Sequence, residues 1–121
     1  MSPKTSILIA EDEAMLRLIA VEMLQDAGFE VFEAADGVEA LELLKANPQI
    51  VLLVSDIKMP RMDGYALVEA GLVFRPDLKV LLMTGYAQEP PPQVLKAREI
   101  QILHKPFGLE QLCALAAQMT A

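Results

Sequence analysis

The chain has 121 residues, of which 54 % are hydrophobic and 22 % are charged, and its formal net charge is −7. This length predicts one domain over residues 1–121, large enough for a hydrophobic core. The composition excludes a disordered or fibrous protein. The acidic balance argues against direct binding of nucleic acid through phosphate contacts.

The sequence also contains no signal for a membrane. No apolar run approaches the roughly 20 residues that a transmembrane helix needs, and the first run is too short for a signal peptide. We therefore expect no membrane insertion. The single cysteine, Cys113, cannot form an internal disulfide, so we expect a reducing, cytoplasmic location.

Apolar runs of strand length alternate with segments of helical periodicity along the chain. The predicted strands cover residues 6–10, 30–34, 51–56, 79–84 and 100–104. In the first helix the expected buried face is Leu16, Ile19, Ala20, Met23, Leu24 and Ala27. Gly28 is expected to end that helix in the left-handed conformation, and Asp63 to cap the third helix.

The third and fourth helices are unusual. The third carries apolar residues outside its main stripe, which favours a tolerant surface and leaves a homodimer open. Between the last two strands, Pro90, Pro91 and Pro92 cannot lie inside a helix. The fourth helix can therefore hardly begin before Pro92, which leaves it about two turns.

This alternation predicts an α/β fold, with a doubly wound five-stranded parallel sheet and five helices, the fourth of them short. Length alone does not determine the strand order. The flavodoxin-like order 2-1-3-4-5 would place the first and third strands side by side at the switch point. Glu11, Asp12 and Asp56, which follow or end those strands, would then meet, with Thr84 and Lys105 beside them.

Converging carboxylates cannot all stay ionised without a counter-charge. An all-oxygen ligand set suits Mg²⁺, and a metal, an ammonium and a hydroxyl around Asp56 would form a phosphoryl site with that carboxylate as nucleophile. Simpler explanations exist for each residue alone. Glu11, Asp12 and Glu13 could simply cap the first helix, Thr84 is an ordinary strand residue, and a lone lysine is usually solvated.

Taken together, the motifs resemble response-regulator receiver domains of two-component signalling, the CheY-like family. They are the segments 9–13 (Ile-Ala-Glu-Asp-Glu), 56–64 (Asp-Ile-Lys-Met-Pro-Arg-Met-Asp-Gly), 83–87 (Met-Thr-Gly-Tyr-Ala) and 105–107 (Lys-Pro-Phe). The likeness runs from about Ser6 to Ala117. It implies a switch rather than an enzyme, in which a sensor histidine kinase or histidine phosphotransfer protein donates a phosphoryl group from a phosphohistidine.

The resemblance also implies a role for each site residue. Asp56 would be the phosphoacceptor, and Thr84 and Lys105 would contact the phosphoryl oxygens. Mg²⁺ would be bound by Asp12, Asp56 and the backbone carbonyl of Lys58, with Glu11 acting through water.

One departure from the family puts the usual readout in doubt. Most receivers carry Tyr or Phe three residues before the lysine, where this chain has Ile102, and Tyr86 is a candidate substitute. The alternative function is therefore a receiver-fold interaction module that acts largely without phosphorylation. An aspartate-nucleophile phosphohydrolase is disfavoured, because Lys58 stands where a second acid is needed, and the acidic segment after the first strand disfavours a flavin-binding module.

Overall fold

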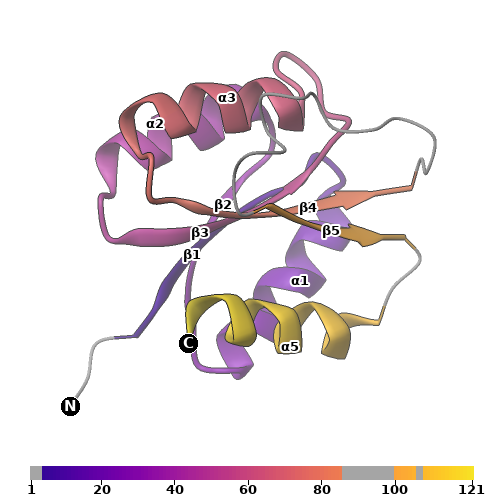
Figure 1. The fold of residues 1–121 in the computed structure, drawn as a ribbon. Helices are drawn as coiled ribbons and strands as arrows, with labels where there is room; N and C mark the ends of the chain where they lie inside the picture. Colours follow the sequence, from indigo (N-terminus) through magenta and orange to yellow (C-terminus); the bar gives the residue numbers. More distant parts are fainter. Residues whose placement is uncertain (1–3, 86–99, 106–107) are drawn as a thin grey trace.

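A central sheet lies between two layers of helices (Figure 1). The computed structural model describes residues 4–85, 100–105 and 108–121. Its strands are β1 (Ser6–Ala10), β2 (Glu30–Ala34), β3 (Ile50–Asp56), β4 (Lys79–Thr84) and β5 (Ile100–His104). Its helices are α1 (Ala14–Asp26), α2 (Gly37–Ala46), α3 (Gly64–Phe74) and α5 (Leu109–Thr120). None of these helices is long and apolar enough to cross a bilayer.

All neighbouring strands are parallel, and their order is β2-β1-β3-β4-β5. This confirms the predicted α/β class and the order 2-1-3-4-5. The part of the chain that the structure describes contains four helices. The short helix predicted after Pro92, and Tyr86, lie outside the described residues.

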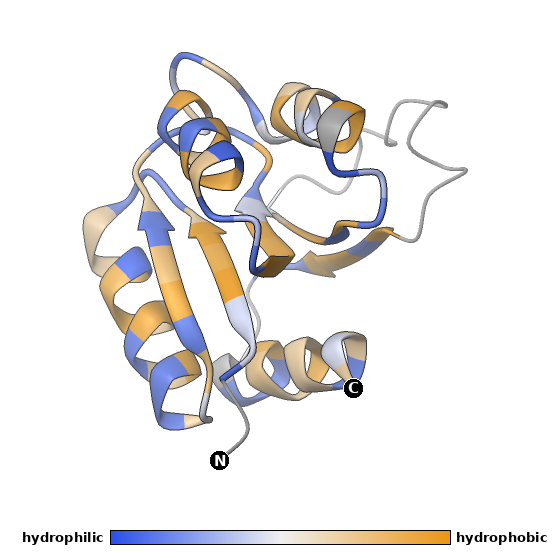
Figure 2. Cartoon of the chain, turned by 90° about the vertical axis from the view of Figure 1, so that its left-hand side faces the viewer, coloured by the Kyte–Doolittle hydropathy of each residue, from blue (hydrophilic) through white to orange (hydrophobic). Residues whose placement is uncertain are grey.

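The sheet separates two hydrophobic cores, because successive residues of a strand point to opposite faces. Leu8 and Leu53 pack on the side of α2 and α3, whereas Ile9 and Leu52 pack on the side of α1 and α5. The central strands are therefore apolar on both faces, as the mainly orange colour of the strands in Figure 2 shows. The polar side chains of β1, β3 and β4 gather at the strand ends.

The predicted buried face of α1 was partly wrong. Leu16 and Ile19 are 40 % and 38 % exposed, and the buried residues are Ala20, Val21 and Leu24. Ala27 is exposed as well, whereas Ala20 and Leu24 are buried as predicted and Met23 is half-buried. The observed stripe begins at Arg17, whose side chain is only 20 % exposed. A charged residue gives no apolar signal, so the start of the stripe was missed.

The predicted helix ends are confirmed. Gly28 has φ 100° and donates its backbone N–H to the carbonyl of Gln25, while Phe29 donates to Leu24, which is the Schellman arrangement. Asp63 caps α3 by accepting a hydrogen bond from the backbone N–H of Ala66 at 2.8 Å. These two residues determine where α1 ends before β2 and where α3 begins after β3.

Candidate functional site

The carboxyl ends of four strands meet at one edge of the sheet, and polar residues stand at each of them. After β1, Glu11 is held through its backbone, since its N–H donates to the carbonyl of Ala34 at 3.1 Å. Its own carbonyl accepts a hydrogen bond of 2.8 Å from the Arg17 guanidinium, which also lies 3.3 Å from Glu33. This segment is therefore fastened to both β2 and α1.

Asp56 ends β3 and is buried. The next residue, Ile57, donates its N–H to the carbonyl of Met83 on β4 at 3.1 Å and accepts one from Gly64 at 2.7 Å. A Cβ at Gly64 would lie 2.4 Å from the carbonyl oxygen of Asp56, so only glycine fits there. The backbone around the aspartate is thus fixed from both sides.

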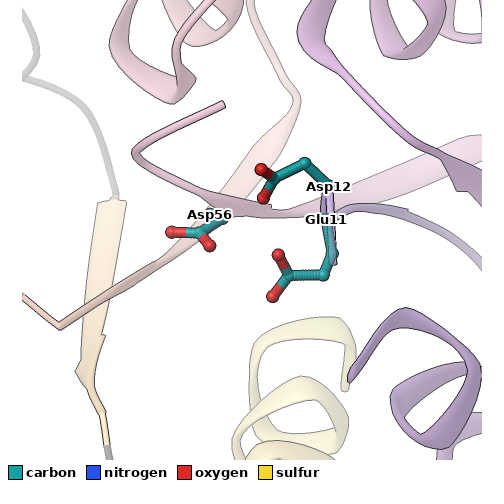
Figure 3. Close-up of side chains that lie close together, drawn as sticks. All are labelled: Glu11, Asp12 and Asp56. Atoms are coloured by element: carbon teal, nitrogen blue, oxygen red, sulfur yellow. The ribbon is translucent and has the colours of Figure 1, made fainter. Parts of the chain in front are cut away.

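The predicted convergence of the acids is present in the structure. Carboxylate oxygens of Glu11, Asp12 and Asp56 all lie within 4.8 Å of one another, and Figure 3 shows these side chains turned toward a common space. Glu11 and Asp56 are buried and Asp12 is exposed. Of the residues that the structure describes, no others form such a cluster. The set of hard oxygen donors, open to solvent on one side, fits Mg²⁺ with water completing its shell.

Lys105 brings a positive charge to the same place. Its Nζ lies 2.9 Å from Oδ2 of Asp56 and 3.4 Å from Oε1 of Glu11. Its backbone N–H donates to the carbonyl of Thr84 at 2.7 Å, which joins the ends of β4 and β5. Thr84 itself is buried at the end of β4. The structure therefore brings all four strand ends of the predicted site together.

The electrostatics show that the acids are short of positive charge. Burial raises the pKa of Glu11 to about 7, and the neighbouring charge of Asp56 adds to the rise. Burial lowers the pKa of Lys105, but its hydrogen bond to Asp56 and the charges of Asp56 and Glu11 more than offset this, so the pKa is raised. The ammonium stays charged, yet one ammonium does not balance three carboxylates.

The simpler capping explanation holds only in part for α1. Glu13 is its N-cap residue and its side chain makes no capping hydrogen bond, but Oε2 of Glu11 accepts one of 3.3 Å from the backbone N–H of Glu13. Lys58, a predicted ligand through its carbonyl, lies in the loop between β3 and α3 with its side chain exposed.

Two contributors to the site were missed from the sequence. Arg17 holds the Glu11 carbonyl, and its spacing of three residues from Ala20 was the available signal. Ser55 is fully buried and donates its hydroxyl to the carbonyl of Asp56 at 2.8 Å. Nothing in an apolar strand pattern indicates that bond.

Comparison with known proteins agrees with this geometry. The model of the response regulator receiver domain matches residues 7–117. The chain therefore belongs to the response regulator receiver domain family, the phosphoacceptor receivers of two-component phosphorelays.

Curated relatives include both short regulators and long kinases. The chain is 38 % identical to the response regulator receiver protein CpdR of Brucella abortus over 107 residues, covering 88 % of each chain. It is 37 % identical to the sensor kinase CckA of the same species over 121 residues, which are 98 % of this chain but 13 % of the kinase. With the sporulation initiation phosphotransferase F of Bacillus subtilis it shares 31 % identity over 110 residues, 88 % of this chain and 86 % of that protein.

Solved structures show the same fold. The receiver domain of the hybrid histidine kinase CckA superposes with a TM-score of 0.82 at 32 % identity, covering 96 % of this chain and 99 % of that domain. A chemotaxis protein of Vibrio cholerae gives a TM-score of 0.85 at 31 % identity, covering 97 % of this chain and 99 % of that protein.

The raised pKa of Glu11 predicts how stability depends on pH. Its folded pKa of about 7 lies above the ordinary value of 4.5, so the folded chain holds this proton more tightly than the unfolded chain. The free energy of unfolding should therefore fall as the pH rises through this window. In metal-free buffer at pH 8, Glu11→Gln should raise the free energy of unfolding by about 1–3 kcal/mol.

Urea denaturation of both chains at several pH values measures this difference. The advantage of Glu11→Gln should shrink as the pH is lowered from about 8 to about 5.5, because the wild-type carboxyl becomes protonated. An advantage that stays constant over this range would contradict the assignment.

Proposed function

We propose that Asp56 is the phosphoacceptor of this receiver and that Mg²⁺ is its cofactor. The observation that carries the proposal is the cluster of carboxylates within 4.8 Å, with the Lys105 ammonium 2.9 Å from Asp56. Asp12, Asp56 and the carbonyl of Lys58 would hold the metal, and Glu11 would act through a bound water. The domain itself would be residues 1–121 with its core at 6–117, and it would act in the cytoplasm, which the single cysteine fits.

The reaction is a phosphoryl transfer from the phosphohistidine of a sensor kinase or phosphotransfer protein. A carboxylate oxygen of Asp56 attacks phosphorus, the P–N bond breaks, and its electron pair remains on the imidazole of the donor. An acyl phosphate of Asp56 results. When bound, Mg²⁺ supplies positive charge to the oxygens of the transferring group.

The other side chains of the site would balance the charge of the phosphoryl group and hold it and the metal-bound water in position. Lys105, on a flexible stem, can turn from Asp56 to a phosphoryl oxygen, and so follow the negative charge as it moves. Thr84 stands at the end of the neighbouring strand, where its hydroxyl would bond a phosphoryl oxygen. Glu11 would orient a water on the metal through its carboxylate, which requires it to be ionised.

Phosphorylation would shift a conformational equilibrium that a partner reads. In this chain the readout cannot use an aromatic side chain on β5, because Ile102 stands at that position and packs against the core on the side of α2 and α3. We propose that the signal passes instead through the movement of Lys105 and Thr84 at the ends of β5 and β4.

The surface of α1 fits contact with the donor protein. Four exposed apolar side chains lie along it, with Met15 64 % exposed, Leu18 49 % exposed, and Leu16 and Ile19 beside them. Exposed apolar clusters mark protein contacts, and this one begins three residues after Asp12. A protein that delivers a phosphohistidine to a buried aspartate must cover the rim of the site, so its contact would extend onto this helix.

The phosphoacceptor is tested by mass spectrometry after incubation with acetyl phosphate and Mg²⁺. The wild-type chain should gain the mass of one phosphoryl group, and Asp56→Asn should gain none, because an amide is a poor nucleophile. Asp63→Asn, which keeps its cap on α3, is the matched control and should still be phosphorylated. A wild-type chain that gains no mass would favour the interaction module that acts without phosphorylation.

Lys105→Met should separate metal binding from transfer. Because the ammonium competes with a cation for Asp56 and Glu11, its loss should leave the Mg²⁺ affinity unchanged or raise it. The rate of phosphorylation should fall by about 10²-fold, as expected when one charge-stabilising donor is removed. Calorimetric titration and the acetyl phosphate assay measure the two quantities. Loss of Mg²⁺ binding in this variant would contradict the assigned roles.

Leu18→Ser should separate the two kinds of donor. Transfer from a phosphorylated histidine phosphotransfer protein should slow by about tenfold, the cost of losing one well-buried interface side chain. The rate with acetyl phosphate should not change, since no contact with α1 is needed. Val73→Ser, on the 83 % exposed valine of α3, is the control and should change neither rate. Equal slowing with both donors would exclude a docking role for α1.

A further inference from the structure

The loop from Ile57 to Asp63 contains the one residue other than glycine that has a positive φ in the part of the chain that the structure describes. Arg61 has φ 68°, in the left-handed region that side chains other than glycine rarely adopt. The N–H of Met62 donates to the carbonyl of Pro60 at 2.7 Å, so Arg61 is the central residue of a γ-turn. With a positive φ this is the rarer and more strained form of that turn.

Two contacts hold the strained turn against the start of α2. The Arg61 guanidinium lies on Oδ2 of Asp36, with Nη2 at 2.8 Å and Nε at 3.0 Å. The other oxygen of Asp36, Oδ1, accepts a hydrogen bond of 2.9 Å from the N–H of Glu39 and so caps α2. One carboxylate therefore fixes both the beginning of α2 and the tip of the loop.

Backbone packing reinforces the ion pair. A Cβ on Gly37 would lie 2.4 Å from the carbonyl oxygen of Met62, so the loop rests directly on the first turn of α2. At its base the loop is closed by the hydrogen bond of 2.7 Å from Gly64 to Ile57. Strained conformations persist where surrounding contacts over-determine them, and such places concentrate at functional sites.

We propose that Arg61 and Asp36 are positioning residues for the metal site. Their ion pair holds the loop in the strained form in which the backbone carbonyl of Lys58 would join Asp56 as a ligand of Mg²⁺. This inference rests on the proposed function, in which that carbonyl is a ligand of Mg²⁺. Neither positioning residue touches the metal, and each acts through the backbone of the loop.

For Arg61, an electrostatic role and a positioning role predict opposite effects on Mg²⁺ binding. Arg61→Met removes a positive charge, so a purely electrostatic effect would strengthen Mg²⁺ binding. A positioning effect weakens it, because the loop loses its anchor while the strain at residue 61 remains. Asp36→Asn keeps the cap on α2, since an asparagine oxygen can accept the bond from Glu39, but it loses the charged contact to Arg61.

The experiment is a calorimetric titration of the full chain with MgCl₂, for wild type, Arg61→Met, Asp36→Asn and the double variant. Each single variant should bind Mg²⁺ about 3- to 10-fold more weakly. The double variant should be no weaker than the weaker single one, because both changes remove one contact. Arg61→Lys should recover part of the loss, and Asp77→Asn, which removes the Arg75–Asp77 ion pair elsewhere, should bind as wild type.

Phosphorylation by acetyl phosphate distinguishes positioning from general damage. The single variants should need more Mg²⁺ to reach half of the maximal rate, while the rate at saturating Mg²⁺ stays within about twofold of wild type. Tighter Mg²⁺ binding by Arg61→Met, or additive losses in the double variant, would overturn this inference and leave the proposed function standing. A wild-type chain that binds no Mg²⁺ would overturn the proposed function, and this inference with it.

Discussion

Repulsion among three carboxylates at one edge of the sheet is the constraint on which the site depends. Glu11, Asp12 and Asp56 would separate if their backbones were free, because together they lack enough positive charge. The parallel sheet prevents this, since β1 and β3 are paired neighbours in unbroken register from Ile7 to Ala10, the end that leads to the acids. The packed cores on both faces of the sheet therefore supply the free energy that keeps like charges together.

This stored repulsion accounts for both roles proposed for these residues, cation binding and phosphoryl transfer. A site that is short of positive charge attracts a divalent cation, and the cation then draws in a phosphoryl group with its own negative oxygens. Lys105 balances part of the charge in the resting chain through its contact with Asp56. Burial and the charge of Asp56 raise the pKa of Glu11 to about 7. Small changes in pH near neutrality, or in the charge around it, therefore change how far Glu11 is ionised.

Much of the fold and the site followed from the sequence, for physical reasons that differ between elements. Strands buried on both faces are continuous apolar runs, so β1 and β4 were predicted with the bounds that the structure has. Residues at strand ends are brought together by topology alone, which is why the sequence predicts the grouping of the acids, Thr84 and Lys105.

The parts that could not be predicted depend on contacts between distant residues. The start of the buried stripe of α1 was missed because it is Arg17, whose charge gives no apolar signal, and the bond of Arg17 to Glu11 depends on the turn between them. Asp36 and Arg61 are 25 residues apart, and nothing in the sequence indicates that they form an ion pair. Contacts of this kind depend on how the loops fold over the sheet. The local periodicity of the sequence carries no information about that folding.

The acids, Thr84 and Lys105 all stand at strand ends, and none belongs to the outer face of a helix. The outward surfaces of α1, α3 and α5 can therefore change during evolution without altering the reaction. Duplicated copies of such a gene could diverge in which proteins they meet while keeping identical chemistry, which is how parallel signalling lines in one cell become insulated from each other. The separation of recognition from reactivity is thus a property of the layered architecture itself.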